Sequence, residues 1–499
     1  MGWKSKAILP FAYRVTRRLQ KEDNNPIFYQ EKIFSELISK ARHTQFGKDH
    51  DLASIKSHDD FKLNVPLKDY NDIKPYIERI QQGQCDVLWP GLPKYFVGTS
   101  GTTSGVKYIP LTKESMPYHF ASARNATFQF CTQHQLLKIF DGKMMFLSGS
   151  PELYKKGVIN TGRLSGIVNN EIPNWLRSNQ IPTYQTNCID DWEEKIKQIV
   201  LESHDQNMTM ISGITPWIIM YAEYLLDHAG KPTLKDIFPQ LKLIIHGGVN
   251  FGPYKEKLYR LAGEGVKYME TYPASEGYIA SQVPDDQGLR LNVNGGIFFE
   301  FIEPKDIDKG GRRLSLKEVE LGKEYAIILN NNAGFFSYIL GDTVKFIKKN
   351  PYRLIITGRL SQFISAFGEH VIVSEVERAM ERSSKQVGVM INEFSIAPNI
   401  SPDQQTKGYH EWFVEFDEER VDVRSFSKIL DENMRAENFH YKDLVKGKII
   451  DQLRIVPIKK NGFRDYMKSI GKLGGQNKVP KLANDRLHAN RLLEYKIDL

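Results

Sequence analysis

Seven consecutive residues near position 100 are all glycine or small hydroxyl residues. Glycine reaches backbone conformations that other residues avoid, and small side chains let successive N–H groups face inward as an anion-binding nest. The hydroxyl groups add further donors, so we predict that this segment binds phosphate; a plain flexible turn is the alternative. It is not a Walker loop, because the Gly-Lys-Ser/Thr ending is absent and a strand follows. The residues of this predicted phosphate loop are Thr99, Ser100, Gly101, Thr102, Thr103, Ser104 and Gly105.

Two acidic residues farther along the chain each follow an apolar run. Glu276 is placed to hold the Mg²⁺ that bridges phosphate oxygens. Asp342 ends a predicted strand, where a carboxylate can accept hydrogen bonds from ribose hydroxyls, as acidic residues do at other nucleotide sites. Tyr272 can stack on a base, and the pair Gly247 and Gly248 admits a flat adenine close to the backbone. Taken singly, such residues also occur in solvated loops, in turns and in ordinary cores.

The predicted elements around these residues alternate between strands and helices. Short apolar runs that end in glycine are typical of buried strands, and Thr215-Pro216 with Gly230 is typical of the two ends of a helix. Thr112 is a predicted N-cap for the helix that follows the loop. This alternation favours an α/β architecture with some parallel sheet. The predicted strands are residues 94–98, 106–112, 143–149, 208–213 and 241–248, and the predicted helices are residues 25–46, 112–133 and 215–230.

The character of the sequence changes at residue 289. Short strands separated by turns follow one another as far as residue 357, which indicates a β-rich subdomain or barrel. After Gly358 the pattern returns to mixed α/β, with predicted strands at residues 409–416 and 453–458. A chain of 499 residues is too long for one core, so two or three domains are expected.

Composition and charge exclude several classes of protein. No apolar run reaches the ~20 residues that span a bilayer, so we expect no integral membrane segment, and the N-terminus has no signal-peptide pattern. Three widely spaced cysteines make neither a disulfide framework nor a metal site, which favours a reducing, cytoplasmic location.

Residues 441–499 hold 14 Lys and Arg against 6 Asp and Glu, which accounts for the whole net charge of +8. Because the aromatic-basic interleaving of a nucleic-acid platform is not visible there, the charge indicates a small anionic ligand and no nucleic acid.

The phosphate loop resembles that of the acyl-adenylate-forming superfamily, which includes acyl-CoA synthetases, luciferases and peptide-synthetase adenylation domains. Within it the sequence most resembles the plant auxin- and jasmonate-conjugating acyl acid amido synthetases, whose loop reads Ser-Ser-Gly-Thr-Ser-Gly-Gly. Two further segments agree with the family in order and spacing. TYPASEG, from Thr271 through Ser275 to Gly277, resembles the second nucleotide motif. YILGD, which ends at Asp342, resembles the third nucleotide motif. The Pro-Ala pair in TYPASEG is stiffer than the usual small residues, and YILGD lacks an arginine often present there.

The resemblance implies a fold and a set of ligands. The expected fold is a large N-terminal α/β domain over residues 1–358, with mixed sheets and a β-barrel-like subdomain, and a small α+β C-terminal lid domain over residues 359–499. ATP and Mg²⁺ are the implied cofactors, and a small carboxylic acid and an amine or amino acid the implied substrates. We expect a monomer. Nucleotide contacts are implied at Thr271, Tyr272, Ser275 and Glu276.

The resemblance also implies roles for three basic residues. Arg359, at the domain junction, would hold ribose or phosphate oxygens in a fork. Lys478 is the implied lid lysine, whose charge would offset the negative charge that develops as a carboxylate attacks phosphorus. Lys472 and Lys481 are competitors for that role. Arg124, on the helix after the loop, would meet the carboxylate of the acyl substrate.

Three classes of function remain open. The favoured one is an enzyme that forms an acyl-adenylate and passes the acyl group to an amine, giving an amide. The second is an acyl-CoA ligase with the same first half-reaction, which the basic C-terminal segment would suit. The third is a nucleotide-binding protein without turnover. The absence of a Ser/Thr-Gly-Lys turn after Arg359 favours the amide, because coenzyme A ligases usually carry that turn around their lid lysine.

Overall fold

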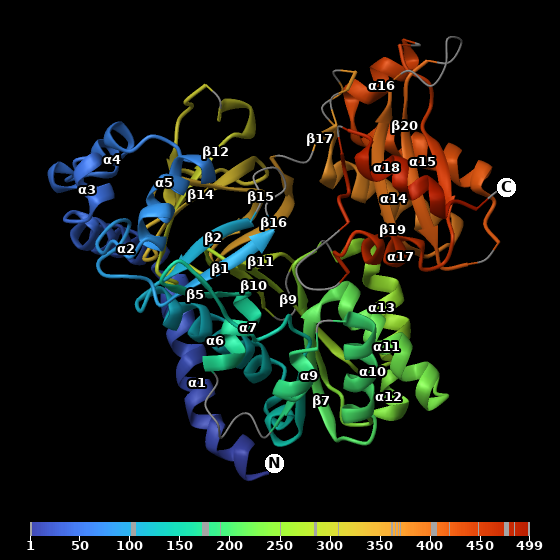
Figure 1. The fold of residues 1–499 in the computed structure, drawn as a ribbon, viewed down its shortest axis with the longest axis horizontal. Coiled ribbons are helices and arrows are strands. Elements are labelled where there is room, and N and C mark those ends of the chain that lie inside the picture. Colours follow the sequence, from blue (N-terminus) through green and yellow to red (C-terminus); the bar gives the residue numbers. More distant parts are fainter. Residues whose placement is uncertain are drawn as a thin grey trace. The chain divides into compact units, whose positions relative to one another are not determined.

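Two units make up the computed structural model of the protein (Figure 1). The first unit comprises Met1–Val249 and Leu261–Ile356, and the second comprises Asn250–Arg260 and Thr357–Leu499. The short segment Asn250–Arg260 thus belongs with the C-terminal part of the chain, which the predicted division at residue 358 did not include. The structure describes residues 2–100, 106–171, 179–189, 191–249, 251–283, 287–307, 309–360, 363–364, 366–367, 369, 371–400, 407–418, 420–447, 449–473, 479–483 and 485–497.

A large mixed sheet runs through the first unit. Among the described residues its strands follow the order β13-β12-β14-β15-β16-β11-β10-β9-β8-β7-β3-β6. The strands from β6 to β9 pair in parallel, and from β9 onward the pairs are antiparallel. The strands are β3 (Lys143–Phe146), β6 (Gln180–Ile181), β7 (Met208–Ile214), β8 (Leu243–Gly247), β9 (Lys267–Ala274), β10 (Gly277–Gln282), β11 (Leu289–Leu291), β12 (Ile297–Ile302), β13 (Leu314–Ser315), β14 (Glu324–Asn331), β15 (Tyr338–Lys349) and β16 (Tyr352–Arg359).

The strands of the predicted β-rich subdomain are the antiparallel half of this sheet. Alternate residues along a strand point to opposite faces, and here one face forms a continuous apolar core. Phe299 and Phe301 of β12 share that core with Ile327 and Leu329 of β14 and with Val344 of β15. The predicted mixed α/β character and the predicted β-rich segment are therefore confirmed, and the two are joined in one sheet.

A second, four-stranded sheet lies at the start of the first unit. Its order is β2-β1-β5-β4 among the described residues, with β1 antiparallel to β2 and parallel to β5. The apolar side chains of Phe96, Val97, Ile109 and Leu111 are buried. Because neighbouring residues of a strand point to opposite faces, both faces of these strands are covered. The strands are β1 (Tyr95–Ser100), β2 (Val106–Leu111), β4 (Tyr154–Lys156) and β5 (Ile159–Gly162).

Two helices of the first unit show how the local sequence sets helix ends. α11 (Thr215–Ala229) has a proline in its first turn and ends at Gly230, whose φ of 60° is left-handed, as the sequence predicts. α6 (Ser115–Gln133) begins three residues after the predicted cap. The Thr112 hydroxyl nevertheless accepts a 2.9 Å hydrogen bond from the Ser115 N–H, so it serves one of the unpaired amides at this helix start.

The remaining helices cover the sheets. The predicted helix over residues 25–46 is divided in two by Thr44, whose hydroxyl caps a new helix by accepting from Gly47 N–H at 3.0 Å. The helix α1 (Trp3–Asn24) packs Val15 and Leu19 into the core that it shares with Phe130 of α6. The others are α2 (Pro26–Ala41), α3 (Gln45–Asp49), α4 (His58–Asn64), α5 (Tyr70–Gln81), α7 (Leu164–Glu171), α9 (Tyr184–Asn187), α10 (Trp192–Ser203) and α12 (Leu234–Ile237).

The second unit has a three-stranded sheet and its own core. The central strand β20 (Tyr409–Phe416) is buried along its whole length, and Phe394, Trp412 and Leu430 lie in the core around it. The helix α13 (Lys255–Ala262) begins within Asn250–Arg260 and so enters this unit. The other elements are β17 (Phe363–Ile364), β18 (Val371–Ile372), β19 (Ile391–Asn399), β21 (Arg454–Ile458), α14 (Val373–Val387), α15 (Val423–Glu437), α16 (Phe439–Lys446), α17 (Gly462–Ser469) and α18 (Leu487–Leu492).

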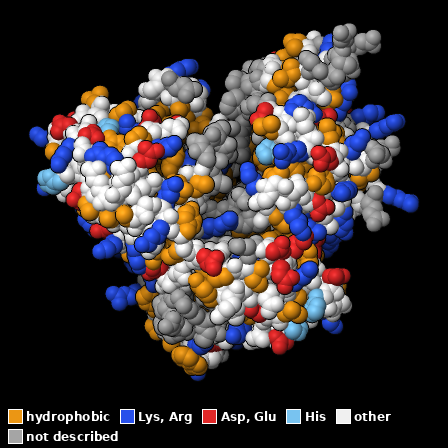
Figure 2. All heavy atoms as spheres, viewed as in Figure 1, with side chains coloured by type: hydrophobic (Ala, Val, Ile, Leu, Met, Phe, Trp, Pro, Cys, Tyr) orange, Lys and Arg blue, Asp and Glu red, His pale blue; other side chains and the backbone are white. Residues whose placement is uncertain are grey.

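The surface has mixed charge. On the face shown in Figure 2, the described Lys and Arg side chains are interspersed with Asp and Glu, with no continuous basic stripe. Within the described part of the chain, no helix has both the length and the apolar character needed to cross a membrane. In the described part of the chain, Cys85, Cys131 and Cys188 are not joined in a disulfide bond.

Candidate active site

The strands that flank the predicted phosphate loop form a hairpin in the first unit. Thr99 pairs with Lys107, and Ser100 pairs with Val106 at the end of the ladder. Thr99 and Ser100, which are the first two residues of the predicted loop, therefore lie at the end of β1. Gly101–Gly105 lie outside the described residues, so the phosphate contacts of this segment stay a prediction.

Two glycines mark the carboxyl edge of the parallel strands, where ligands of open α/β sheets commonly bind. Gly247 ends β8 and pairs with Thr271 of β9. A Cβ at Gly247 would lie 2.2 Å from the carbonyl oxygen of Thr271, so the absence of a side chain is required for these strands to approach. Gly248 is exposed and has a φ of 79°. The first glycine thus serves strand packing, and the second leaves backbone open to a ligand.

Tyr272 and Asp342 meet although 70 residues separate them. The hydroxyl of Tyr272 donates a 2.5 Å hydrogen bond to Asp342 Oδ2. Both side chains are buried, and Gly341 precedes the carboxylate with a left-handed φ of 91°. The structure therefore brings together the predicted base contact and the predicted ribose contact, and it fixes one oxygen of the carboxylate by a hydrogen bond.

Glu276 lies in the turn between β9 and β10, with its side chain partly exposed. The Asn331 side chain holds this turn, because its Nδ2 donates to the Glu276 carbonyl at 2.9 Å. The same side chain accepts from the backbone N–H groups of Ala333 and Phe335 at 3.0 and 3.1 Å. Ser275 lies beside Glu276 in the turn and is also partly exposed. Asn331 went unnoticed in the sequence because nothing local distinguishes it from a strand-end asparagine.

The residues of the site fit a Mg²⁺ ion that is coordinated in part by the protein and in part by a bound ligand. The described residues contain no group of three His, Cys, Asp or Glu side chains able to hold a metal ion. Mg²⁺ is usually bound by one or two carboxylates together with substrate phosphates and water. A single carboxylate at Glu276 therefore suits Mg²⁺ that arrives with a polyphosphate, and it does not suit a resident metal held by protein alone.

Two titratable residues immediately precede predicted nucleotide contacts in the sequence. His246 and Glu270 are directly paired across β8 and β9. Burial lowers the pKa of His246 to about 4 and raises the pKa of Glu270 to about 7, because a dry environment disfavours either charge. His246 is therefore a neutral imidazole at physiological pH, and Glu270 changes charge near it. Sequence reasoning missed both, since burial of a strand residue is a tertiary property.

The basic residues assigned to the domain junction and lid belong to the second unit. Arg359 is the last residue of β16 and is exposed, and Lys478 lies outside the described residues. Lys481 forms an ion pair with Glu393, and its Nζ lies 4.2 Å from the centre of the Phe394 ring. Lys472 is exposed. The ammonium of Lys481 is thus engaged within its own unit. The lid role of Lys478, with Lys472 and Lys481 as competitors, stays a prediction.

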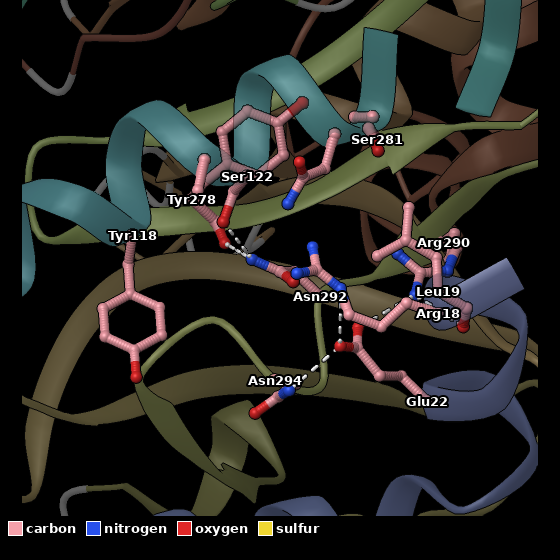
Figure 3. A pocket seen from close by; sticks show the side chains of 13 residues that line it. Arg18, Leu19, Glu22, Tyr118, Ser122, Tyr278, Ser281, Arg290, Asn292 and Asn294 are labelled. Atoms are coloured by element: carbon pink, nitrogen blue, oxygen red, sulfur yellow. Dashed lines mark hydrogen bonds and ion pairs between the residues drawn. The ribbon is translucent and has the colours of Figure 1, made fainter. Parts of the chain in front are cut away.

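A cavity of about 180 Å³ lies between α1, α6, β10 and the segment that begins with β11. Arg124 does not line it. The guanidinium of Arg124 lies over the Phe11 ring of α1 at 5.3 Å and donates to Asn125 Oδ1 at 3.3 Å. The side chains that line the cavity (Figure 3) are those of Arg18, Leu19, Glu22, Tyr118, Ala121, Ser122, Asn125, Ala126, Tyr278, Ser281, Arg290, Asn292 and Asn294.

Three family models match the chain in the order of its domains. Residues 15–231 match the GH3 family N-terminal domain, residues 291–359 the GH3 family central domain and residues 374–487 the GH3 family C-terminal domain. The protein belongs to the GH3 family. The predicted resemblance to the acyl acid amido synthetases is therefore confirmed at the level of the family.

Curated relatives of this GH3 protein are plant enzymes. Jasmonoyl--L-amino acid synthetase JAR6 of Nicotiana attenuata is 22% identical over 91% of this chain and 90% of its own length. Jasmonoyl--L-amino acid synthetase GH3.5 of Oryza sativa subsp. japonica is 22% identical over 91% of this chain and 92% of its own. Both matches therefore extend over nearly the whole chain.

Solved structures share the fold. The GH3.15 acyl acid amido synthetase has a TM-score of 0.81 at 17% identity, over 97% of this chain and 96% of that one. A 2-hydroxyisobutyryl-CoA ligase in its postadenylation state has a TM-score of 0.58 at 13% identity, over 96% and 91%. The GH3 fold of this chain is thus a form of the wider fold of acyl-adenylate-forming enzymes.

Proposed function

We propose that this GH3 protein activates a carboxylic acid with ATP and transfers the acyl group to an amine, forming an amide. In the first step a carboxylate oxygen bonds to the α-phosphorus of ATP and pyrophosphate leaves. In the second step a neutral amine attacks the acyl carbon, and AMP leaves with the electron pair of the broken C–O bond. The proton of the amine passes to a base or to water. The membership of the GH3 family supports this reaction.

The hydrogen bond from Tyr272 to Asp342 is the observation that carries the nucleotide site. We propose that Asp342, held in place by Tyr272, accepts hydrogen bonds from the ribose hydroxyls. The base would lie against the backbone at Gly247 and Gly248, and Thr99–Gly105 would receive the phosphates. Mg²⁺ on Glu276 would neutralise phosphate oxygens. Thr271 and Ser275 would complete the nucleotide contacts.

We propose that Lys478 supplies the positive charge at the reacting carboxylate and α-phosphate. A preorganised charge is most effective where negative charge develops in the transition state. Arg359, at the end of β16, would hold ribose or phosphate oxygens. The role of Arg124 as an acyl contact remains a prediction; its guanidinium lies against Phe11 and Asn125.

The acyl acceptor is an amine in this proposal, and an amino acid in particular. Two plant relatives that span nearly the whole chain are named for conjugation to amino acids. Coenzyme A is the competing acceptor, since an acyl-adenylate is equally open to a thiol. We further propose a reducing, cytoplasmic location, which is supported by three cysteines that form no disulfide among the described residues.

One experiment tests the reaction and the acceptor together. Purified protein is given ATP, Mg²⁺ and a panel of acids, with either coenzyme A or a pool of amino acids, and the products are identified by mass. We expect an amide and AMP with amino acids. A thioester without an amide would replace the proposal by an acyl-CoA ligase. Binding of ATP without release of pyrophosphate from any acid would indicate a nucleotide-binding protein without turnover.

A further inference from the structure

The helix α1 has an inner and an outer face of different character. The inner face packs Ala12, Val15 and Leu19 into the core of the first unit. Residues three or four positions apart lie on the same side of a helix, and one row with this spacing runs along the opposite, outer face. The members of this row are all exposed, and they are Trp3, Ala7, Pro10, Arg14, Arg17 and Lys21.

The outer face of α1 is basic. Glu22, the first acidic residue of the helix, is buried, and its Oε1 lies 3.5 Å from Arg18 Nε. The next residue is Asp23, whose Oδ1 lies 2.6 Å from Arg290 Nε. Among the described residues of α1, no acid lies on the outer face. The exposed cations of the helix are Lys6, Arg14, Arg17, Arg18 and Lys21.

Four of these cations have no partner within the described part of the chain. The side chains of Lys6, Arg14, Arg17 and Lys21 form neither a hydrogen bond nor an ion pair there. Arg14 and Arg17 are three positions apart, and Arg17 and Lys21 are four apart. Like charges at such spacings weaken a helix slightly, and an anionic surface beside the helix would offset this repulsion. The outer face of α1 is therefore complementary to a negatively charged partner.

The apolar residues of the outer face gather toward its N-terminal end. Trp3 is 75% exposed and Tyr13 is 50% exposed, and Pro10 lies between them in the sequence. Trp and Tyr are enriched at membrane–water interfaces, because an apolar ring with one polar group suits the level of the lipid headgroups. Arg14, Arg17 and Lys21 follow these rings along the helix. A nucleic-acid platform would instead alternate rings and cations along the bound strand, so the separation favours a lipid surface.

The setting of α1 determines how it can meet a membrane. The 18 positions from Trp3 to Lys21 span about 27 Å at 1.5 Å per residue, and Figure 1 shows α1 at the border of the first unit, next to the N-terminus. Because the apolar inner face is already used in the core, the helix cannot turn that face into a bilayer. Contact through the outer face would be mainly electrostatic, with few apolar anchors, and would therefore be reversible and sensitive to salt.

We propose that the outer face of α1 docks this protein on the surface of a membrane that contains anionic lipids. Lys6, Arg14, Arg17 and Lys21 lie against the lipid headgroups, and the ring of Trp3 lies among them. The cytoplasmic surface of membranes carries such anionic lipids. The inference concerns the place at which the enzyme works, and it does not depend on the proposed reaction.

Vesicles of two compositions test the docking. The intact protein is floated with vesicles of phosphatidylcholine alone and with vesicles that contain about 30% phosphatidylserine, at about 0.1 M and about 0.5 M salt. We expect binding to the anionic vesicles at the lower salt, at least tenfold weaker binding at the higher salt, and little binding to the neutral vesicles. Equal binding to both compositions, or no binding to either at the lower salt, would overturn the inference.

A triple variant locates the docking on α1. Arg14→Gln, Arg17→Gln and Lys21→Gln together should weaken binding to the anionic vesicles about a hundredfold, because each basic residue near such a surface contributes about fivefold. Trp3→Ala should weaken it about tenfold through the loss of apolar contact. Circular dichroism checks that the variants fold. Unchanged binding in the folded triple variant would overturn the assignment to this face.

A matched triple variant controls for net charge. Arg424→Gln, Lys428→Gln and Lys442→Gln remove three exposed cations of α15 and α16 and the same total charge, and this protein should bind as the wild type does. An equal loss in both triple variants would overturn docking through α1. A single-stranded oligonucleotide is tested in parallel. Binding to it and not to the vesicles, with loss in the α1 variant, would replace the lipid surface by nucleic acid and overturn the proposal.

Discussion

The hydroxyl of Tyr272 on β9 donates a 2.5 Å hydrogen bond to the Asp342 carboxylate on β15. The two strands are separated in the sheet by β10, β11 and β16, so the bond ties the parallel half to the antiparallel half. A carboxylate that is oriented by a tyrosine needs less reorganisation when it binds ribose. This relationship makes Tyr272 a positioning residue for Asp342.

Asp342→Ala should weaken ATP binding by about 1–3 kcal/mol, because hydrogen bonds to a charged group would be lost. Tyr272→Phe should cost less, since the carboxylate remains and only its orientation is released. Calorimetric titration with ATP and Mg²⁺ measures both. Unchanged affinity in Asp342→Ala would remove this residue from the nucleotide site.

Lys478→Ala should slow formation of the acyl-adenylate by roughly 10²–10³-fold, which is typical of losing one preorganised electrostatic group. ATP binding should barely change, because the proposed ATP contacts are mainly on the first unit. Single-turnover measurement of acyl-adenylate separates the two effects. Normal formation in this variant would transfer the role to Lys472, whose Ala variant should then show the loss.

Lys481→Ala should act on stability. Its ammonium pairs with Glu393, and the Tyr254 hydroxyl donates to the same carboxylate at 3.1 Å. Removing the cation would leave a partly buried carboxylate with a neutral partner, at a cost of about 1–3 kcal/mol. Urea unfolding should show this loss. Lys472→Ala, at an exposed position, is the control and should not change the unfolding midpoint.

Glu415 should make the stability of the second unit depend on pH. Burial raises the pKa of this carboxyl, on β20, from 4.5 to about 7. The folded state therefore binds this proton more tightly, so the contribution of Glu415 to stability is highest below pH 4.5 and falls as pH rises through about 7. At 1.36 kcal/mol per pKa unit, the loss is about 3 kcal/mol.

Glu415→Gln isolates this effect. The unfolding free energy of the variant minus that of the wild type should grow by about 3 kcal/mol between pH 4.5 and pH 8, whatever constant offset the amide introduces. Urea unfolding at several pH values measures the difference. A flat difference across this range would contradict the raised pKa.

The sequence is sufficient to predict elements whose signals are local. The hydroxyl-rich segment and the end of β8 at Gly247 follow from short patterns of residue type, and the left-handed Gly230 follows from the end of one helix. Contacts between distant segments have no such signal. The hydrogen bond from Asn331 to the Glu276 turn, and the packing of Arg124 on Phe11, depend on where separate elements meet in space. They could not be predicted from spacing along the chain.

The assignment of Asn250–Arg260 to the second unit has a consequence for the connectivity of the protein. The chain passes from one unit to the other three times, at residues 249–250, 260–261 and 356–357, and the second passage lies inside the helix α13. A chimeric GH3 protein that joins a new C-terminal domain near residue 357 would keep the original Lys257. In this protein Lys257 contacts Asn392 and Asp417. In the chimera it would meet the residues of a different domain instead.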